Sequence, residues 1–151
     1  MNRDKVFQQL MIDEGVVYEV YNDHLGYPTF GVGHLVTKFD EEYDQPVGTL
    51  VSEERVRRVF NQDLDDAICN CRSLYGEGTF DRFPAEVQEI LVNMIFNLGP
   101  TGLKRFKKMN THLYNKNWKL AAVEGRDSRW YNQVTNRAER LMSRLEKVDA
   151  L

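Results

Sequence analysis

Strand-forming residues occupy only one short stretch of this 151-residue chain, close to its start. Residues 17–21 and 27–32 are rich in β-branched and aromatic side chains, and the sequence DHLG at 23–26 has the composition of a turn. Later apolar residues recur at intervals of three and four, which is helical spacing. The sequence therefore predicts an α+β, mostly helical fold with one β-hairpin near the N-terminus.

Two helices are predicted on either side of this hairpin. The first runs from a cap at Asn2 to Gly15. The second begins after Ser52, where acidic residues suit the positive end of the helix dipole, and it spans roughly 20 residues. Its apolar stripe consists of Val56, Val59, Phe60, Leu64, Ala67, Ile68 and Cys71.

The remaining chain is predicted to be helical. Pro84 opens a helix that Gly99 and Pro100 close, and Asn136 precedes a glutamate at the spacing of a capping box, which predicts that it caps the last helix. Residues 39–50 contain a proline and a glycine and are assigned no element.

We expect a single domain, residues 1–151, built in three parts. These are an α+β lobe at 1–51, a linking helix at 52–73 and an all-helical lobe at 74–151. A chain of this length can bury an adequate core without disulfides or metals. Ligand clefts form between lobes of this kind.

The composition excludes several functional classes. A net charge of −3 gives no overall field that would attract nucleic acid. No stretch is long and apolar enough for a membrane span, and acidic residues near the start argue against a signal peptide. Cys69 and Cys71 point to opposite faces of a helix and are expected to be free thiols in a reducing compartment. Without metal-ligand spacing, we expect no metal and no cofactor.

One cluster of cations stands apart from this acidic background. Lys104, Arg105, Lys107 and Lys108 surround Phe106. The cluster could meet a polyanionic polymer, but a solvated helix face is the favoured interpretation of a short charge run.

Glu14, Asp23 and Thr29 form the most suggestive chemical set. Hydrolysis of a sugar acetal needs a protonated carboxyl for the leaving oxygen and an ionised carboxylate that directs a water, and a hydroxyl can hold that water. The end of a helix favours the protonated form of Glu14, whereas a polar turn favours ionised Asp23. Considered alone, Glu14 is better explained as a solvated acid at a helix end and Asp23 as a turn former.

Six sequence blocks extend this set over nearly the whole chain. They are IDEG at 12–15, YND at 21–23, GYPTFGVGHLVTK at 26–38, FNQDLDDA at 60–67, VNMIFNLGPTG at 92–102 and SRWYNQ…NRA at 128–138. In this order they resemble the T-even-type phage lysozymes. The resemblance implies a lysozyme-like two-lobe fold and a muramidase that hydrolyses the β-1,4 bond between N-acetylmuramic acid and N-acetylglucosamine in bacterial peptidoglycan, usually as an endolysin in host cell lysis.

The resemblance also assigns roles to individual residues. It implies that Glu14 is the general acid, that Asp23 positions the attacking water and that Thr29 provides a hydroxyl beside this water. Leu35 and Phe96 match positions that contact sugar. We expect inversion at the anomeric carbon, because a water placed between two carboxyl groups attacks directly.

Several positions depart from the family pattern. Met109 stands where a serine is expected, Glu124 where an asparagine is expected, and Pro28 replaces an aromatic residue before Thr29. These departures affect sugar affinity and preference for peptide cross-links. The resemblance further implies a monomer without nucleic-acid or stable membrane partners. It would reach the wall from the cytoplasm of an infected host, with the help of a separate membrane-permeabilising factor.

Alternatives remain open at this point. A non-catalytic wall-binding module and a chitin-cleaving enzyme both suit the architecture, and a free endolysin is favoured over part of an injection device. His34 is interpreted as structural, paired with an acid such as Asp63. Trp130 and Tyr131 are interpreted as a buried aromatic pair, and the glycines at 31 and 33 as sites of close backbone approach.

Overall fold

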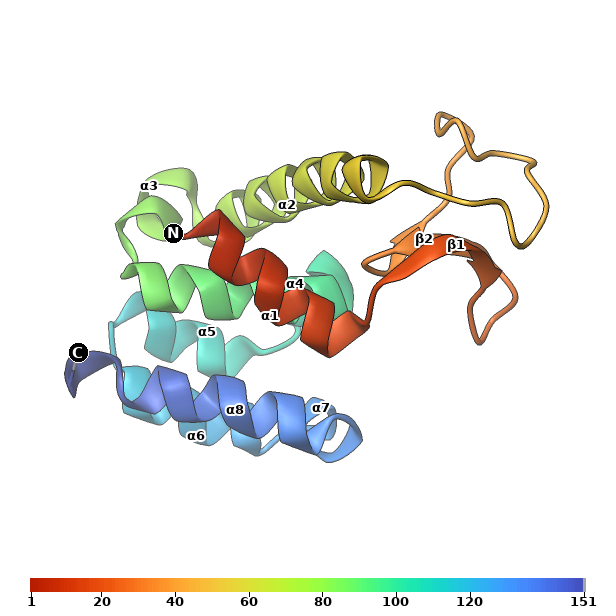
Figure 1. The fold of residues 1–151 in the computed structure, drawn as a ribbon. Coiled ribbons are helices and arrows are strands. Elements are labelled where there is room, and N and C mark those ends of the chain that lie inside the picture. The colour runs from red at the N-terminus through yellow and green to blue at the C-terminus, as the bar shows by residue number, and fades with distance from the viewer. Residues whose placement is uncertain (151) are drawn as a thin grey trace. The chain divides into compact units, whose positions relative to one another are not determined.

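The computed structural model describes residues 1–150, apart from the side chain of Ala150, and is shown in Figure 1. The described chain forms two compact units, residues 3–66 and residues 1–2 with 67–151. The elements in order are α1 (Arg3–Glu14), β1 (Val17–Asn22), β2 (Pro28–Gly31), β3 (His34–Leu35), α2 (Glu53–Tyr75), α3 (Glu77–Arg82), α4 (Ala85–Lys104), α5 (Lys107–Tyr114), α6 (Trp118–Arg126), α7 (Arg129–Gln133), α8 (Thr135–Glu146) and the 3-10 helix η1 (Val148–Ala150). The predicted α+β, mostly helical fold is confirmed.

Helix α1 ends where the sequence predicts. Gly15 follows it with φ of 75°, the left-handed conformation that glycine adopts without strain. The buried face of α1 carries Val6 and Leu10. Its Phe7 ring meets the edge of Phe60 on α2 at 4.7 Å between centroids. These contacts hold Glu14, the last residue of α1, on a packed helix.

The three strands form one antiparallel sheet in the order β1-β2-β3, which confirms the predicted hairpin. The loop after β3, orange to yellow in Figure 1, returns to this sheet. Its residues 48–51 run along the free edge of β1, where Gly48 N donates to Val20 O at 2.8 Å and Val51 N donates to Tyr18 O at 2.9 Å. The segment that sequence patterns left unassigned therefore protects an exposed sheet edge.

Helix α2 confirms the long helix expected after Ser52, whose hydroxyl accepts a hydrogen bond from Arg55 N at 3.0 Å. The boundary between the two units falls inside this helix. Cys71 is buried on its apolar face while Cys69 is exposed, as the spacing predicts. Burial raises the pKa of the Cys71 thiol to about 12.

Helix α4 supplies the core of the helical unit through Val87, Ile90 and Met94, none of which is exposed. The helix was predicted to close at Gly99 and Pro100; Gly99 does leave helical geometry, with φ of 72° and ψ of 168°, but the helix then resumes and runs to Lys104. Helix α6 packs on α5 and α8, and α8 also packs on α4 and α7 (Figure 1). In the described part of the chain, no helix is both long and apolar enough to cross a membrane.

The prediction that Asn136 caps the last helix is wrong. Helix α8 already begins at Thr135, its N-cap position is Val134, and no side chain caps it. The side-chain cap nearby belongs to α7, where the Ser128 hydroxyl accepts from Tyr131 N at 3.1 Å. The capping pattern was present, but α8 begins two residues earlier than a cap at Asn136 predicts.

Candidate active site

Three side chains form a row across the small sheet. Thr29 on the central strand β2 pairs with Tyr21 on β1 and with Leu35 on β3. Directly paired residues of antiparallel strands project from the same face, with their Cβ atoms roughly 5 Å apart. Thr29 is only 4% exposed, whereas Leu35 is 51% exposed. The sheet thus places the predicted hydroxyl beside the predicted sugar contact.

The Thr29 hydroxyl has a defined hydrogen-bonding direction. Its Oγ1 donates to Tyr27 O at 2.9 Å. A hydroxyl has one hydrogen to donate, and this bond uses it. The oxygen of Thr29 can therefore only accept further hydrogen bonds. Any water bound there must donate to it.

Asp23 is fixed by the turn that it begins. Its Oδ1 accepts from Leu25 N at 2.9 Å and from Tyr27 N at 2.8 Å, and its own backbone N donates to Tyr27 O at 2.9 Å. Within residues 3–66, its other oxygen, Oδ2, accepts no hydrogen bond. The turn therefore orients the carboxylate through one oxygen and leaves the second for a ligand.

Glu14 is half-buried against the turn between β2 and β3. Gly33 in this turn has φ of 65°, and a Cβ added there would lie 3.5 Å from Glu14 Oε2 and 3.7 Å from Glu14 Cβ. The close approach expected at Gly33 is thus directed at the predicted acid. Gly31 has a different neighbour, since a Cβ there would lie 3.3 Å from Val56 Cγ1.

Tyr21 lies in the electrostatic field of both carboxylates. Burial raises the pKa of its phenol, and the negative charges of Asp23 and then Glu14 raise it further. Both acids therefore act on the same hydroxyl, which makes no hydrogen bond within residues 3–66. Sequence patterns did not single out Tyr21, although its place opposite Thr29 and two residues before Asp23 was readable from the hairpin register.

His34 is confirmed as structural. Its Nδ1 lies 2.7 Å from Asp63 Oδ2, as expected, and its Nε2 lies 2.8 Å from Asp40 Oδ2. Burial opposes protonation of the ring, but the hydrogen bonds and charges of the two carboxylates outweigh it and raise the pKa of His34. Asp40 was not predicted, because it lies in the loop to which no element was assigned.

The loop after β3 is fixed to α2 by a second ion pair. Arg55 donates to Glu42 through Nε at 3.0 Å and Nη2 at 2.9 Å, a two-point contact. This bond lowers the pKa of Glu42 despite its burial. Together with His34, it anchors the segment that leads away from Leu35.

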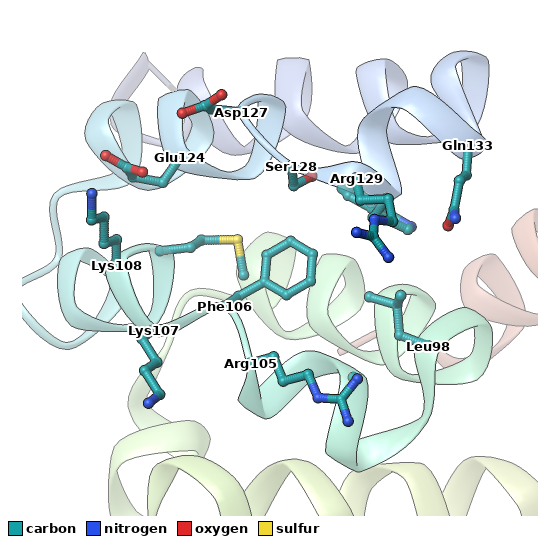
Figure 2. Close-up of a pocket in the computed structure, with 13 residues that line it drawn as sticks. Leu98, Arg105, Phe106, Lys107, Lys108, Glu124, Asp127, Ser128, Arg129 and Gln133 are labelled. Atoms are coloured by element: carbon teal, nitrogen blue, oxygen red, sulfur yellow. The ribbon is translucent and has the colours of Figure 1, made fainter.

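The other predicted sugar contact lies in the helical unit. Phe96 is half-buried on α4, outside the row on the sheet. Met109 and Glu124, the two positions that depart from the family pattern, line one pocket of about 560 Å³, shown in Figure 2. Although fifteen positions apart in sequence, they line the same pocket.

Only one member of the predicted aromatic pair is buried. Trp130 is 4% exposed, meets Phe106 edge-on at 5.9 Å and donates through Nε1 to Asn97 Oδ1 at 2.8 Å. Tyr131 is half-buried and its hydroxyl donates to Glu139 Oε2 at 2.8 Å. Among residues 1–150, no group of three or more His, Cys, Asp or Glu side chains could hold a metal ion.

The chain is similar to known proteins along most of its length. The profile of the family described as phage lysozyme matches residues 12–147. The pre-baseplate central spike protein Gp5 of Enterobacteria phage T4 is 31% identical over 150 residues, which cover 89% of this chain and only 26% of that protein. The probable T4-type lysozymes 1 and 2 of Dictyostelium discoideum are each 27% identical, and the match covers 91% of both partners.

Proposed function

Because this chain belongs to the phage lysozyme family and is a lysozyme-family enzyme, as its sequence motifs predicted, we propose that it cleaves the β-1,4 bond between N-acetylmuramic acid and N-acetylglucosamine in bacterial peptidoglycan. One observation carries the proposal. Asp23 is fixed in the turn of the hairpin that carries Thr29, and Glu14 borders the turn that follows the strand of Thr29. Acetal hydrolysis requires two carboxyl groups, and a hydroxyl that accepts a hydrogen bond from the attacking water can hold this water in place.

Glu14 is the proposed general acid. Its carboxyl gives a proton to the glycosidic oxygen as the bond from this oxygen to the anomeric carbon breaks. The turn at Gly33 borders this carboxyl and holds it in place at the end of α1. Glu14 then regains its proton from solvent.

Asp23 and Thr29 together orient the attacking water. A water can donate one hydrogen bond to Asp23 Oδ2 and the other to Thr29 Oγ1. The lone pairs of its oxygen are then available to attack the anomeric carbon. Two existing hydrogen bonds support this arrangement. The hydroxyl of Thr29 already donates to Tyr27 O, so it can only accept from the water, and Asp23 Oδ1 already accepts from Tyr27 N, so Oδ2 is the oxygen available to the water. As the water attacks, its proton passes to Asp23, which releases it to solvent before the next turnover.

Direct attack by this water predicts inversion at the anomeric carbon. Proton NMR of a soluble peptidoglycan fragment during the first turnovers measures the anomer formed. We expect the α-anomer from a β-linked substrate. Initial formation of the β-anomer would mean a covalent intermediate and would remove the water-directing role from Asp23.

Leu35, exposed at the end of the row, and Phe96 on α4 are the proposed sugar contacts. The decisive experiment digests purified peptidoglycan, reduces the products and identifies the sugar at the new reducing end. A muramic acid end supports the proposal, a glucosamine end would show the other glycosidic specificity, and no new end would indicate a binding module. Cleavage of chitin oligomers at a similar rate would favour the chitin-cleaving alternative.

We further propose that the enzyme lyses a bacterial host from its cytoplasm, aided by a separate membrane-permeabilising factor. The similarity to a phage spike protein over 26% of that protein keeps a virion-associated role as the alternative. Expression in the bacterial cytoplasm distinguishes them. We expect cells to stay intact until a pore-forming agent is added and then to lyse, whereas lysis without the agent would contradict the need for a factor.

A further inference from the structure

Asp40 is a largely buried carboxylate in a surface loop. Its side chain is only 12% exposed, although its neighbours Phe39 and Glu41 are both exposed. A buried charge is costly unless it is paired and hydrogen-bonded. The contacts of Asp40 therefore show what offsets this cost and which parts of the fold depend on it.

Both oxygens of this carboxylate are engaged. Oδ2 lies 2.8 Å from Nε2 of His34, and it accepts from the backbone N and the hydroxyl of Thr37 at 2.8 and 3.3 Å. Oδ1 lies 3.5 Å from Nη2 of Arg55, which makes an ion pair. Asp40 thus joins three segments, namely β3, the turn that follows β3 and helix α2.

The contact between His34 and Asp40 closes a short loop, residues 34–40, which we call the 34–40 loop. Leu35 is the first residue inside this loop and is 51% exposed. Strand β3 contains only His34 and Leu35, and it is an outer strand that pairs with β2 alone. So short a strand is weakly held by its own pairing, and the placement of Leu35 therefore depends on the closure of the loop.

The other end of this closure is fixed in the core. His34 pairs with Phe30 on β2, a fully buried residue whose ring lies 5.1 Å from the imidazole between centroids. Nδ1 of the same imidazole lies 2.7 Å from Asp63 on α2. Asp40 therefore binds an imidazole that two other groups already hold in place.

We propose that Asp40 is a positioning residue for the substrate, because it closes the 34–40 loop and thereby holds Leu35 in the orientation that contacts sugar. The inference rests on the proposed function, in which Leu35 is a sugar contact. Asp40 itself needs to touch neither the substrate nor the reacting atoms. Its loss should weaken substrate binding and leave the chemical step unchanged, since Leu35 contacts the sugar equally before and during bond cleavage.

Hydrolysis of soluble peptidoglycan fragments tests this role. In Asp40→Ala we expect KM to rise about fivefold while kcat stays within about twofold. Asp40→Asn keeps an oxygen that can accept from His34 and Thr37, so it should restore most of the affinity. Asp63→Ala is the matched control, because it removes the other carboxylate of the imidazole from outside the 34–40 loop, and its KM should stay within about twofold of normal.

A double-mutant cycle connects the effect to Leu35. Leu35→Ala should raise KM by itself, and adding Asp40→Ala should then raise it by less than about twofold, because the contact that Asp40 positions is already absent. A further rise as large as that of Asp40→Ala alone would mean that Asp40 does not act through Leu35.

Hydrogen exchange measured by NMR examines the loop without substrate. The Val36 amide donates to Pro28 O at 3.0 Å and not to Asp40. In Asp40→Ala it should exchange at least about tenfold faster, relative to the amide of the buried Leu64 on α2. Unchanged exchange at Val36, or an equal rise of KM in the Asp63→Ala control, would overturn the proposal. Failure of the unmodified enzyme to release reducing ends would contradict the proposed function instead, and the exchange measurement does not depend on it.

Discussion

Tyr21 and Thr29 stand directly opposite each other on β1 and β2, in the one row of the sheet that also carries Leu35. Asp23 follows β1 within the same hairpin, and Glu14 precedes it at the end of α1. The hairpin and the end of α1 therefore carry the proposed acid, the proposed base and the hydroxyl proposed to hold the water. Each of the following predictions disturbs one of these relationships.

Tyr21→Phe removes a hydroxyl that lies in the field of both carboxylates. We expect kcat/KM to fall about tenfold, or roughly 1.4 kcal/mol of transition-state stabilisation. The pH of maximal activity should also move, which a purely structural role for the ring would not cause. Tyr18→Phe, at an exposed tyrosine of the same strand, is the control and should leave both quantities unchanged.

Thr29→Val keeps the shape of the side chain and removes the oxygen that accepts a proton from water. We expect kcat to fall at least about tenfold, because the water loses one of its two acceptors. Thr29→Ser retains the oxygen and should keep most of the activity. Equal rates for the two variants, both with intact thermal transitions, would exclude the hydroxyl from the reaction.

Gly33→Ala and Gly31→Ala form a matched pair. Both glycines have positive φ, so each alanine should cost roughly 1–2 kcal/mol of unfolding free energy, measured with denaturant. Only the methyl at position 33 would border the carboxyl of Glu14, whereas the methyl at 31 would meet Val56. Specific activity should therefore fall in Gly33→Ala alone. A fall in both variants would show that the contact between Gly33 and Glu14 has no specific effect on activity.

His34 makes stability depend on pH. Its pKa is raised in the folded state, so its contribution is complete below its unfolded pKa and disappears as pH rises through the folded pKa. We expect the unfolding free energy to fall as the pH rises above about 6.5, the ordinary pKa of histidine. The pKa of Asp40 is lowered, so its contribution is present above its unfolded pKa and disappears as pH falls through the folded pKa.

Denaturant titrations of Asp40→Asn and Asp63→Asn check this assignment. Each variant removes one of the two carboxylates that hold the imidazole. Both should flatten the decline of stability between neutral and alkaline pH. A decline that persists unchanged in both variants would have to come from another group.

Local patterns were sufficient to predict the elements that carry the site. The hairpin follows from its β-branched runs and turn residues, and the end of α1 follows from Gly15. The break at Gly99 and the pairing of His34 with Asp63 were also predictable. In each case, a short stretch or a single plausible partner determined the structure.

Other features required long-range information. The approach of Gly33 to Glu14 depends on how the β2–β3 turn packs on α1, and the contact of Asp40 with His34 depends on a loop without periodicity. Arg105, Lys107 and Lys108 lie close together in sequence, but only the fold brings Arg129 and Glu124 to the pocket that they line. Asn136 is the opposite case: the sequence contains a capping pattern there, but no side chain caps α8 in the structure.

The central claim is that Glu14 donates the proton that breaks the glycosidic bond. Glu14→Gln is nearly isosteric and cannot supply this proton, so release of reducing ends from purified peptidoglycan should fall at least about a hundredfold while the thermal transition stays near that of the unmodified protein. Hydrolysis at a near-normal rate by this folded variant would contradict the account.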